Sequence, residues 1–191
     1  MRIVAGRAKG RRLGSPPEGT RPTSDRVREA LFSTIGGLVE LDGAHVLDLY
    51  AGSGALGLEA LSRGATSAIL VERDRRAAGV LRANADLVDL PGSEVVVDDV
   101  GKFLRRGRGA RDRIDVAFLD PPYEVPTDEV RRVVAQLVAG EWLADDALVV
   151  VERSARGEES PFPSDGWSEA DRRVYGDTAL WYGRTGRAGR A

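Results

Sequence analysis

The sequence predicts an α/β protein of the Rossmann-like type, in which helices wrap a mostly parallel sheet. Apolar, β-rich segments alternate with segments of helical periodicity from residue 45 onward. A glycine-rich loop follows the first β-rich segment, and two strand-like runs joined by Gly176–Asp177 close the chain. Repeated strand–helix units favour a parallel sheet, and the closing hairpin adds an antiparallel strand.

The individual elements follow from the spacing of apolar residues. A helix is expected after Ser24, a residue type that caps helices, because apolar side chains recur at helical spacing from Val27 to Leu38. Ser154–Gly166 contains two prolines and is too broken for a long helix. We expect strands at 45–50, 67–72, 94–97, 114–119 and 147–152, helices at about 52–63, 74–88, 103–104 and 128–138, and a hairpin at 170–175 and 178–183.

The composition excludes several kinds of chemistry. The chain of 191 residues contains no cysteine and one histidine, His45. Disulfides, iron–sulfur clusters, thiolate metal sites and cysteine nucleophiles are therefore impossible, as is a metal site built from several histidines. Neither a signal peptide nor an apolar stretch of membrane-spanning length is visible. We expect a cytoplasmic protein that uses no metal and no membrane.

A glycine-rich loop occupies residues 48–57, between the first expected strand and its helix. Glycines there let the backbone turn tightly and approach a ligand. Gly52, Gly54 and Gly57 match the dinucleotide pattern GxGxxG, and Glu72 follows Gly52 by twenty residues, where a carboxylate can accept hydrogen bonds from ribose hydroxyls. Both NAD and S-adenosylmethionine fit these features.

Asp48 favours S-adenosylmethionine over NAD. An acid four residues before the first glycine is similar to the methyltransferase pattern, and a carboxylate suits the cationic sulfonium and ammonium groups of that cofactor. Asp99 begins the loop after the third expected strand, where a side chain can meet the adenine amino group. We expect S-adenosylmethionine as cofactor, S-adenosylhomocysteine as product, and a binding site made of Asp48, Gly52, Ser53, Gly54, Glu72 and Asp99.

The tetrapeptide Asp120-Pro121-Pro122-Tyr123 directly follows the apolar segment 114–119. Ligands bind at the carboxyl ends of strands in an open α/β sheet, so the tetrapeptide and the glycine loop share one edge. An exocyclic base amine is a poor nucleophile because its lone pair is delocalised. Hydrogen bonds from its two N–H groups to the Asp120 carboxylate and the Pro121 carbonyl localise that lone pair, and Tyr123 offers a stacking face. These four residues are the expected catalytic residues.

The basic residues gather at the start of the chain. Residues 1–28 hold eight basic and two acidic residues, a net charge of +6, whereas the whole chain carries −2. This distribution favours contact with nucleic acid, although a solvated, disordered tail would give the same pattern. We expect a basic RNA-binding arm at 1–23, a methyltransferase domain at 24–183 and a disordered tail at 184–191, with RNA bound by Arg7, Lys9, Arg11, Arg12 and Arg21.

Several segments together resemble the RsmD-type methyltransferases, which make N2-methylguanine in 16S ribosomal RNA. The resemblance covers nearly the whole chain, and its family-specific part is the N-terminal run. It rests on Arg2–Gly6, Lys9–Arg11, Arg21–Ser33, the glycine loop, Val71–Asp74, Asp120–Tyr123 and Tyr175–Thr178. It implies a seven-stranded class I methyltransferase sheet preceded by an arm, acting on an assembled small ribosomal subunit. The Pro-broken Ser154–Gly166 departs from it, because the general fold usually places a helix there.

Other functions remain open at this point. The tetrapeptide serves an adenine-N6 methyltransferase on DNA or RNA equally well, so only the resemblance favours guanine. A protein-glutamine methyltransferase fits the basic arm less well, and a NAD-binding or non-catalytic binding module would keep the glycine loop. We expect the protein to act as a monomer.

Overall fold

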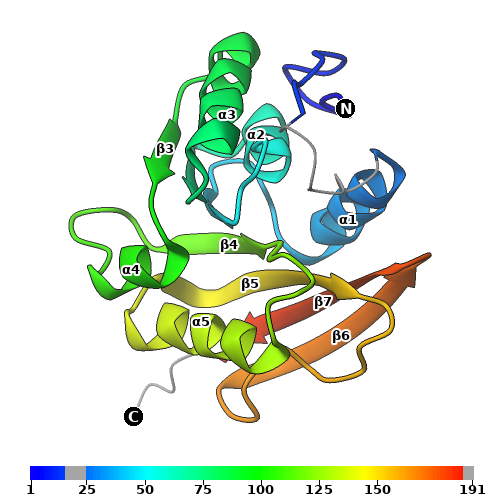
Figure 1. The fold of residues 1–191 in the computed structure, drawn as a ribbon, viewed down its shortest axis with the longest axis vertical. Coiled ribbons are helices and arrows are strands. Elements are labelled where there is room, and N and C mark those ends of the chain that lie inside the picture. Colours follow the sequence, from blue (N-terminus) through cyan, green and yellow to red (C-terminus); the bar gives the residue numbers. More distant parts are fainter. Residues whose placement is uncertain (16–24, 187–191) are drawn as a thin grey trace.

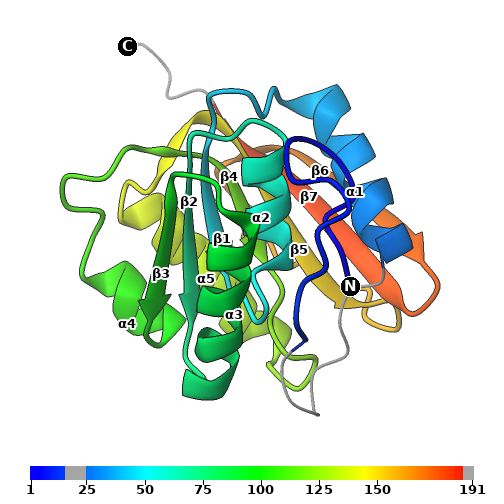
Figure 2. The same ribbon diagram turned by 90° about the horizontal axis from the view of Figure 1, so that it is seen from above.

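Seven strands form one sheet at the centre of the protein (Figure 1). Their order is β3-β2-β1-β4-β5-β7-β6 (Figure 2). This computed structural model describes residues 1–15 and 25–186. Strands β1 to β5 run parallel, and β7 pairs antiparallel with both β5 and β6. The strands are β1 (His45–Leu49), β2 (Ser67–Glu72), β3 (Ser93–Val97), β4 (Ile114–Leu119), β5 (Leu143–Ser154), β6 (Trp167–Tyr175) and β7 (Thr178–Thr185). The predicted fold class, including the closing antiparallel hairpin, is confirmed.

Helices cover both faces of this sheet (Figure 2). On one face lie α1 (Asp25–Leu38), α2 (Ala55–Ser62) and α3 (Arg75–Val88), and on the other lie α4 (Val100–Arg105) and α5 (Thr127–Ala139). The alternation of side chains along each strand explains the two layers. Val46 of β1 packs in the core beneath α1 to α3, whereas Leu47 and Leu49 pack beneath α4 and α5.

Three strands differ by two or more residues from their predicted bounds, and one of them, β6, begins at Trp167 and not at residue 170. β5 is longer than residues 147–152, and β7 continues to Thr185. Thr185 Oγ1 accepts a hydrogen bond from the Ala147 amide at 2.9 Å and donates one to the Ala144 carbonyl at 3.2 Å, so the strand ends beyond residue 183. Residues 155–166 contain no helix. The expected cap Ser24 and the expected RNA ligand Arg21 lie outside the described residues.

The N-terminal segment Met1–Leu13 is packed against the domain. Ile3, Ala8 and Leu13 are buried in the same core as α1, α2 and α3, and an antiparallel bridge pairs Arg2 with Arg12. The segment expected to be an arm at 1–23 therefore contributes three buried apolar side chains to the core of the domain.

A buried carboxylate fixes the same segment to α2. Glu59 accepts hydrogen bonds from the Val4 and Ala5 amides at 2.7 and 3.0 Å and from Arg63 Nε at 2.8 Å. Arg28 of α1 is also fully buried; it lies 3.9 Å from Glu59 and donates to the Arg2 carbonyl. One ionic cluster thus joins the N-terminal segment, α1 and α2.

Within residues 1–15 and 25–186 no helix is long and apolar enough to span a bilayer.

Candidate active site

The carboxyl ends of β1, β2, β4 and β5 meet at one edge of the sheet. β1 lies between β2 and β4, so the glycine loop, Glu72 and Asp120 follow three adjacent strands. The Asp120 amide donates a 3.4 Å hydrogen bond to the Leu49 carbonyl, and the Ala51 amide donates one of 3.0 Å to the Val71 carbonyl. These bonds continue the sheet pairing into the loops and bring the predicted cofactor and substrate residues to a common edge.

Asp48 holds the glycine loop from inside. Its side chain is 1% exposed, and its Oδ2 accepts a hydrogen bond of 2.9 Å from the Gly57 amide at the first turn of α2. Burial raises the pKa of Asp48 to about 7, the Gly57 hydrogen bond opposes that rise, and the charge of Glu72 adds to it. Asp48 therefore positions the loop, and its burial argues against the direct contact with the cofactor cations that the sequence suggested.

Glu72 holds the loop from its outer side. Its Oε2 accepts from the Gly52 amide at 2.9 Å, and its Oε1 accepts from the Asp74 amide at 2.7 Å. Gly52 has a φ of 54°, and a Cβ there would meet only the Tyr50 carbonyl, at 4.0 Å. The backbone at Gly52 therefore faces open space beside a carboxylate, which is the arrangement a ribose-binding loop requires.

Gly54 and Ser53 have structural roles. Gly54 has a φ of 80°, which L side chains rarely adopt, and a Cβ there would lie 2.2 Å from Leu81 Cδ1, so glycine is favoured at this position. The buried Ser53 accepts a 2.9 Å hydrogen bond from Asn84 Nδ2 through its carbonyl. Both residues thus fix the loop against α3.

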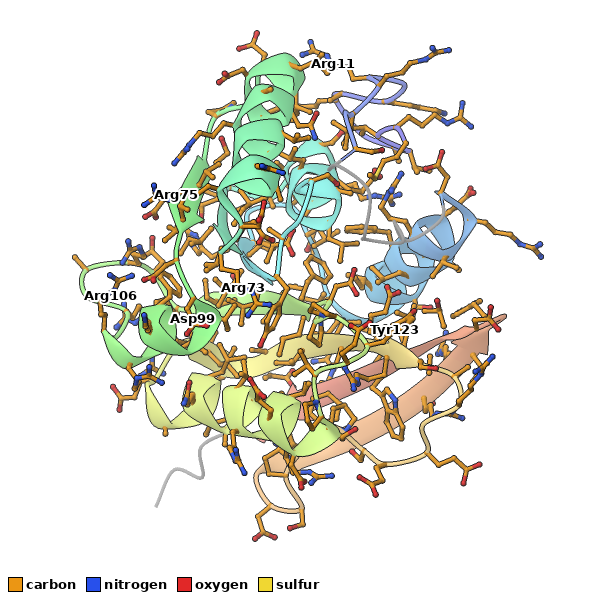
Figure 3. The ribbon with its side chains drawn as sticks, viewed as in Figure 1. Arg11, Arg73, Arg75, Asp99, Arg106 and Tyr123 are labelled. Atoms are coloured by element: carbon orange, nitrogen blue, oxygen red, sulfur yellow. The ribbon has the colours of Figure 1, made fainter. Side chains whose placement is uncertain are left out.

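Asp99 begins α4 and caps it. Its Oδ1 accepts a hydrogen bond from the Lys102 amide at 3.0 Å, while its side chain remains at the surface of the edge (Figure 3). Tyr50, with a left-handed φ of 64°, ends β1 nearby. Burial raises the pKa of Tyr50 to about 12, and the charges of Glu129 and Asp99 add to the rise. A tyrosine in this conformation is unusual and marks the loop as a constrained site.

The tetrapeptide Asp120–Tyr123 turns away from the end of β4. Pro121 is buried and Pro122 exposed, and the Val125 amide closes a turn onto the Pro122 carbonyl at 3.0 Å. Tyr123 is 41% exposed, and its hydroxyl lies 3.4 Å from both Glu152 Oε1 and Thr178 Oγ1. These contacts hold the hydroxyl of Tyr123 in place, while part of its ring remains accessible.

Two residues of this region were missed from the sequence, and both end β5. Glu152 contacts the Tyr123 hydroxyl, and Arg153 Nη2 donates a 2.6 Å hydrogen bond to the Val125 carbonyl. Arg153 is 9% exposed, and burial lowers its pKa while the nearby charges of Tyr123, Tyr50 and Asp120 oppose this. No local motif marks them in the sequence, and their importance comes from their position near the carboxyl end of β5, next to β4.

The expected RNA ligands lie away from the tetrapeptide. Arg7 donates to the Leu61 carbonyl at the end of α2, and Arg11 donates to the Leu87 and Val88 carbonyls at the end of α3. Figure 3 shows Arg11 at one extremity of the view and Tyr123 far from it. Lys9 and Arg12 are exposed on the same segment as Arg7. A hollow lined by Arg7, Asp42 and Arg63 opens near this segment, not at the candidate site.

The described residues contain no group of three or more histidine, aspartate or glutamate side chains suited to a metal ion.

A family model described as Conserved hypothetical protein 95 matches residues 1–184. The chain belongs to this family. The match to the Conserved hypothetical protein 95 family begins at Met1, so it includes the N-terminal segment as well as the strands that carry the site.

Relatives of the family resemble the chain over most of its length. The chain is 37% identical to Ribosomal RNA small subunit methyltransferase D of Escherichia coli over 180 residues. The aligned region covers 94% of this chain and 87% of the relative. The chain is 36% identical over 155 residues to the protein of that name in Haemophilus influenzae, with 80% and 78% covered.

Solved structures share the fold. The putative methyltransferase yhhF from Escherichia coli superposes with a TM-score of 0.83 at 33% identity, covering 97% of this chain and 98% of that chain. SMU.776, solved in complex with SAH, superposes with a TM-score of 0.65 at 18% identity, covering 84% of this chain and 48% of that chain. The fold is that of class I S-adenosylmethionine-dependent methyltransferases.

Proposed function

We propose that this protein is an S-adenosylmethionine-dependent methyltransferase that methylates the exocyclic N2 of a guanine in small-subunit (16S) ribosomal RNA, within an assembled particle. The observation that carries the proposal is the position of Glu72, the glycine loop and Asp120 at the ends of three adjacent strands. Support for the RNA substrate comes from the 37% identical relative named Ribosomal RNA small subunit methyltransferase D.

The residues present fit the adenosine part of the cofactor. Each Glu72 oxygen already accepts one backbone hydrogen bond, and a carboxylate oxygen has a second lone pair with which it can accept from a ribose hydroxyl. The open space at Gly52 lets a ribose approach that carboxylate without a side chain in the way. Asp99, fixed at the start of α4, would meet the adenine amine. When bound, S-adenosylmethionine supplies an electrophilic methyl group on a sulfonium sulfur and leaves as S-adenosylhomocysteine.

The tetrapeptide prepares the nucleophile. The Asp120 carboxylate and the Pro121 carbonyl accept the two N–H bonds of the guanine amine, which localises the nitrogen lone pair toward the methyl group. The amine nitrogen would accept the methyl group that bound S-adenosylmethionine would supply, and Asp120 or water would take the surplus proton. Arg153 holds the turn after the tetrapeptide through the Val125 carbonyl, so these acceptors do not need to reorganise.

Base recognition in this proposal requires the guanine to leave its stack. Tyr123 supplies an accessible aromatic face fixed by its hydroxyl, on which an extruded base can stack. The N-terminal segment would contact phosphates remote from that base through Lys9 and Arg12, together with Arg7 and Arg11. Arg21, which lies outside the described residues, is expected to bind RNA as well. Such contacts orient the RNA without reading its sequence.

Nucleoside analysis of methylated ribosomal subunits tests the proposal. Small subunits from cells that lack this enzyme are incubated with the protein and S-adenosylmethionine carrying a tritiated methyl group, and the RNA is digested to nucleosides. The expected product is labelled N2-methylguanosine. Label in N6-methyladenosine, or in ribosomal protein alone, would contradict the proposal.

A further inference from the structure

A second carboxylate lies beside Asp120. Leu119 of β4 and Val151 of β5 are the last paired residues of these two parallel strands, so Asp120 and Glu152 each come next at the same edge. Glu152 is only 6% exposed, although its side chain is acidic. Glu152 thus places a largely buried carboxylate at the same edge as Asp120, where the proposed substrate base would lie.

Tyr123 connects the two acidic side chains. Its hydroxyl lies 3.4 Å from Glu152 Oε1, and the charges of both Glu152 and Asp120 add to the rise that burial causes in the pKa of the phenol. The neighbouring Arg153 directs its Nη2 to the Val125 carbonyl. A base stacked on the accessible part of Tyr123 would therefore present its edge to a site that holds two carboxylates.

The edges of the purines differ at the atom next to the amine. Guanine presents the N2 amine and the adjacent N1–H, which are both donors. Adenine presents the N6 amine next to N1, which is an acceptor. An ionised carboxylate is purely an acceptor, so two neighbouring carboxylates match guanine and repel N1 of adenine.

We propose that Glu152 selects guanine by accepting the N1–H while Asp120 accepts the N2 amine. This inference rests on the proposed function and addresses the choice between guanine and adenine that the tetrapeptide alone leaves open. A site built around a hydrogen bond rejects an analogue that lacks the donor, because the buried acceptor is then left facing a second acceptor.

The test replaces the target guanine by an analogue that lacks N1–H and O6, and the Glu152 variants show which part of the preference depends on N1. Small-subunit RNA is ligated from synthetic segments so that the nucleotide methylated by the wild-type protein is either guanine or 2-aminopurine, and it is then assembled into particles. 2-Aminopurine keeps the N2 amine but has an acceptor at N1. We compare kcat/KM for the two substrates with the full-length wild type, Glu152→Gln, Glu152→Asp and the control Glu158→Gln, an exposed residue of the loop after β5.

The wild type and Glu158→Gln should prefer guanine by roughly ten- to a hundred-fold or more, as for a lost base-reading bond. Glu152→Gln presents an amide N–H to N1 of 2-aminopurine, so its preference should fall at least roughly ten-fold. Glu152→Asp keeps the charge on a shorter side chain and should lose turnover while it retains the preference.

Each outcome decides the inference. An unchanged preference in Glu152→Gln, with guanine still methylated, would overturn the role of Glu152 and leave the proposed function intact. Should the glutamine variant fail to fold, equal turnover of guanine and 2-aminopurine by the wild type would still overturn the inference, because it means that no group reads N1–H. Methylation of adenine by the wild type would overturn both proposals.

Discussion

The Gly57 amide donates a 2.9 Å hydrogen bond to Oδ2 of Asp48. This bond joins the start of α2 to a buried carboxyl group of β1. Asp48 thus couples the protonation of one side chain to the shape of the glycine loop. Because burial raises its pKa from 3.8 to about 7, Asp48 in the folded protein keeps a proton in a pH range where the unfolded chain has lost it.

The first prediction concerns the pH dependence of stability. The raised pKa of Asp48 means that its contribution to stability is complete below about pH 4 and is lost as pH rises to about 7. Asp48→Asn cannot ionise and can still accept from Gly57. The free energy of unfolding of the variant, relative to wild type, should therefore improve by about 2 to 3 kcal/mol between pH 5 and pH 8. Urea unfolding at each pH measures this, and parallel profiles would refute the account.

Glu72 is predicted to contribute to cofactor affinity. Glu72→Ala should weaken S-adenosylmethionine binding by roughly 1.5–3 kcal/mol, as for hydrogen bonds to a charged group. Calorimetry measures the Kd, with Asp86→Ala on the exposed side of α3 as control. Glu72→Gln keeps the size of the side chain and separates loss of charge from loss of the loop contacts. An unchanged Kd in the alanine variant would remove Glu72 from the site.

Glu59 is predicted to be required for stability. Glu59→Ala removes the acceptor for the Val4 and Ala5 amides and leaves Arg28 buried without this carboxylate. Removal of one partner of a buried ion pair costs about 3–5 kcal/mol. Chemical denaturation compares it with Glu40→Ala, an exposed glutamate after α1. A loss below about 1 kcal/mol, the range of surface pairs, would show that the cluster does not hold the N-terminal segment.

The role of the N-terminal segment in RNA binding requires point variants, because its deletion would remove core residues. Lys9→Gln with Arg12→Gln leaves Ile3, Ala8 and Leu13 in place. Each lost phosphate contact should reduce the slope of log affinity against log salt by roughly one unit. Filter binding of small subunits measures the slope, with Arg132→Gln on α5 as control. Coincident lines for variant and wild type would assign the RNA contacts to other surfaces, first to residues 105–113.

The strands of the sheet could be predicted well because the pattern of apolar residues along a strand depends on which of its faces are buried. The strands at 67–72 and 114–119 were predicted at their observed bounds, since a fully buried parallel strand is a continuous apolar run. The N-terminal segment was predicted less well. Glycine and arginine content indicated an arm, but the burial of Ile3 and Leu13 depends on surfaces of α2 and α3 that are distant in sequence.

The same distinction holds for the site. The residues near Asp120 and Glu72 could be predicted because short motifs follow strand ends directly. Glu152 and Arg153 could not, because their importance comes from β5 lying next to β4 and not from any local motif. The side chain of Asp48 turns inward toward Gly57, a direction that spacing alone does not reveal.

Asp120 carries the central claim, that a carboxylate at the end of β4 activates the amine and does not bind the cofactor. Asp120→Ala should bind S-adenosylmethionine with nearly the wild-type Kd, while its rate falls by roughly 10²–10³, as for loss of one preorganised polar group. Asp128→Ala, at the start of α5, is the matched control. The decisive measurement is the single-turnover rate of methyl transfer to small ribosomal subunits at saturating S-adenosylmethionine. A slow rate with normal cofactor affinity is the predicted result, and a near-normal rate in Asp120→Ala would contradict the account.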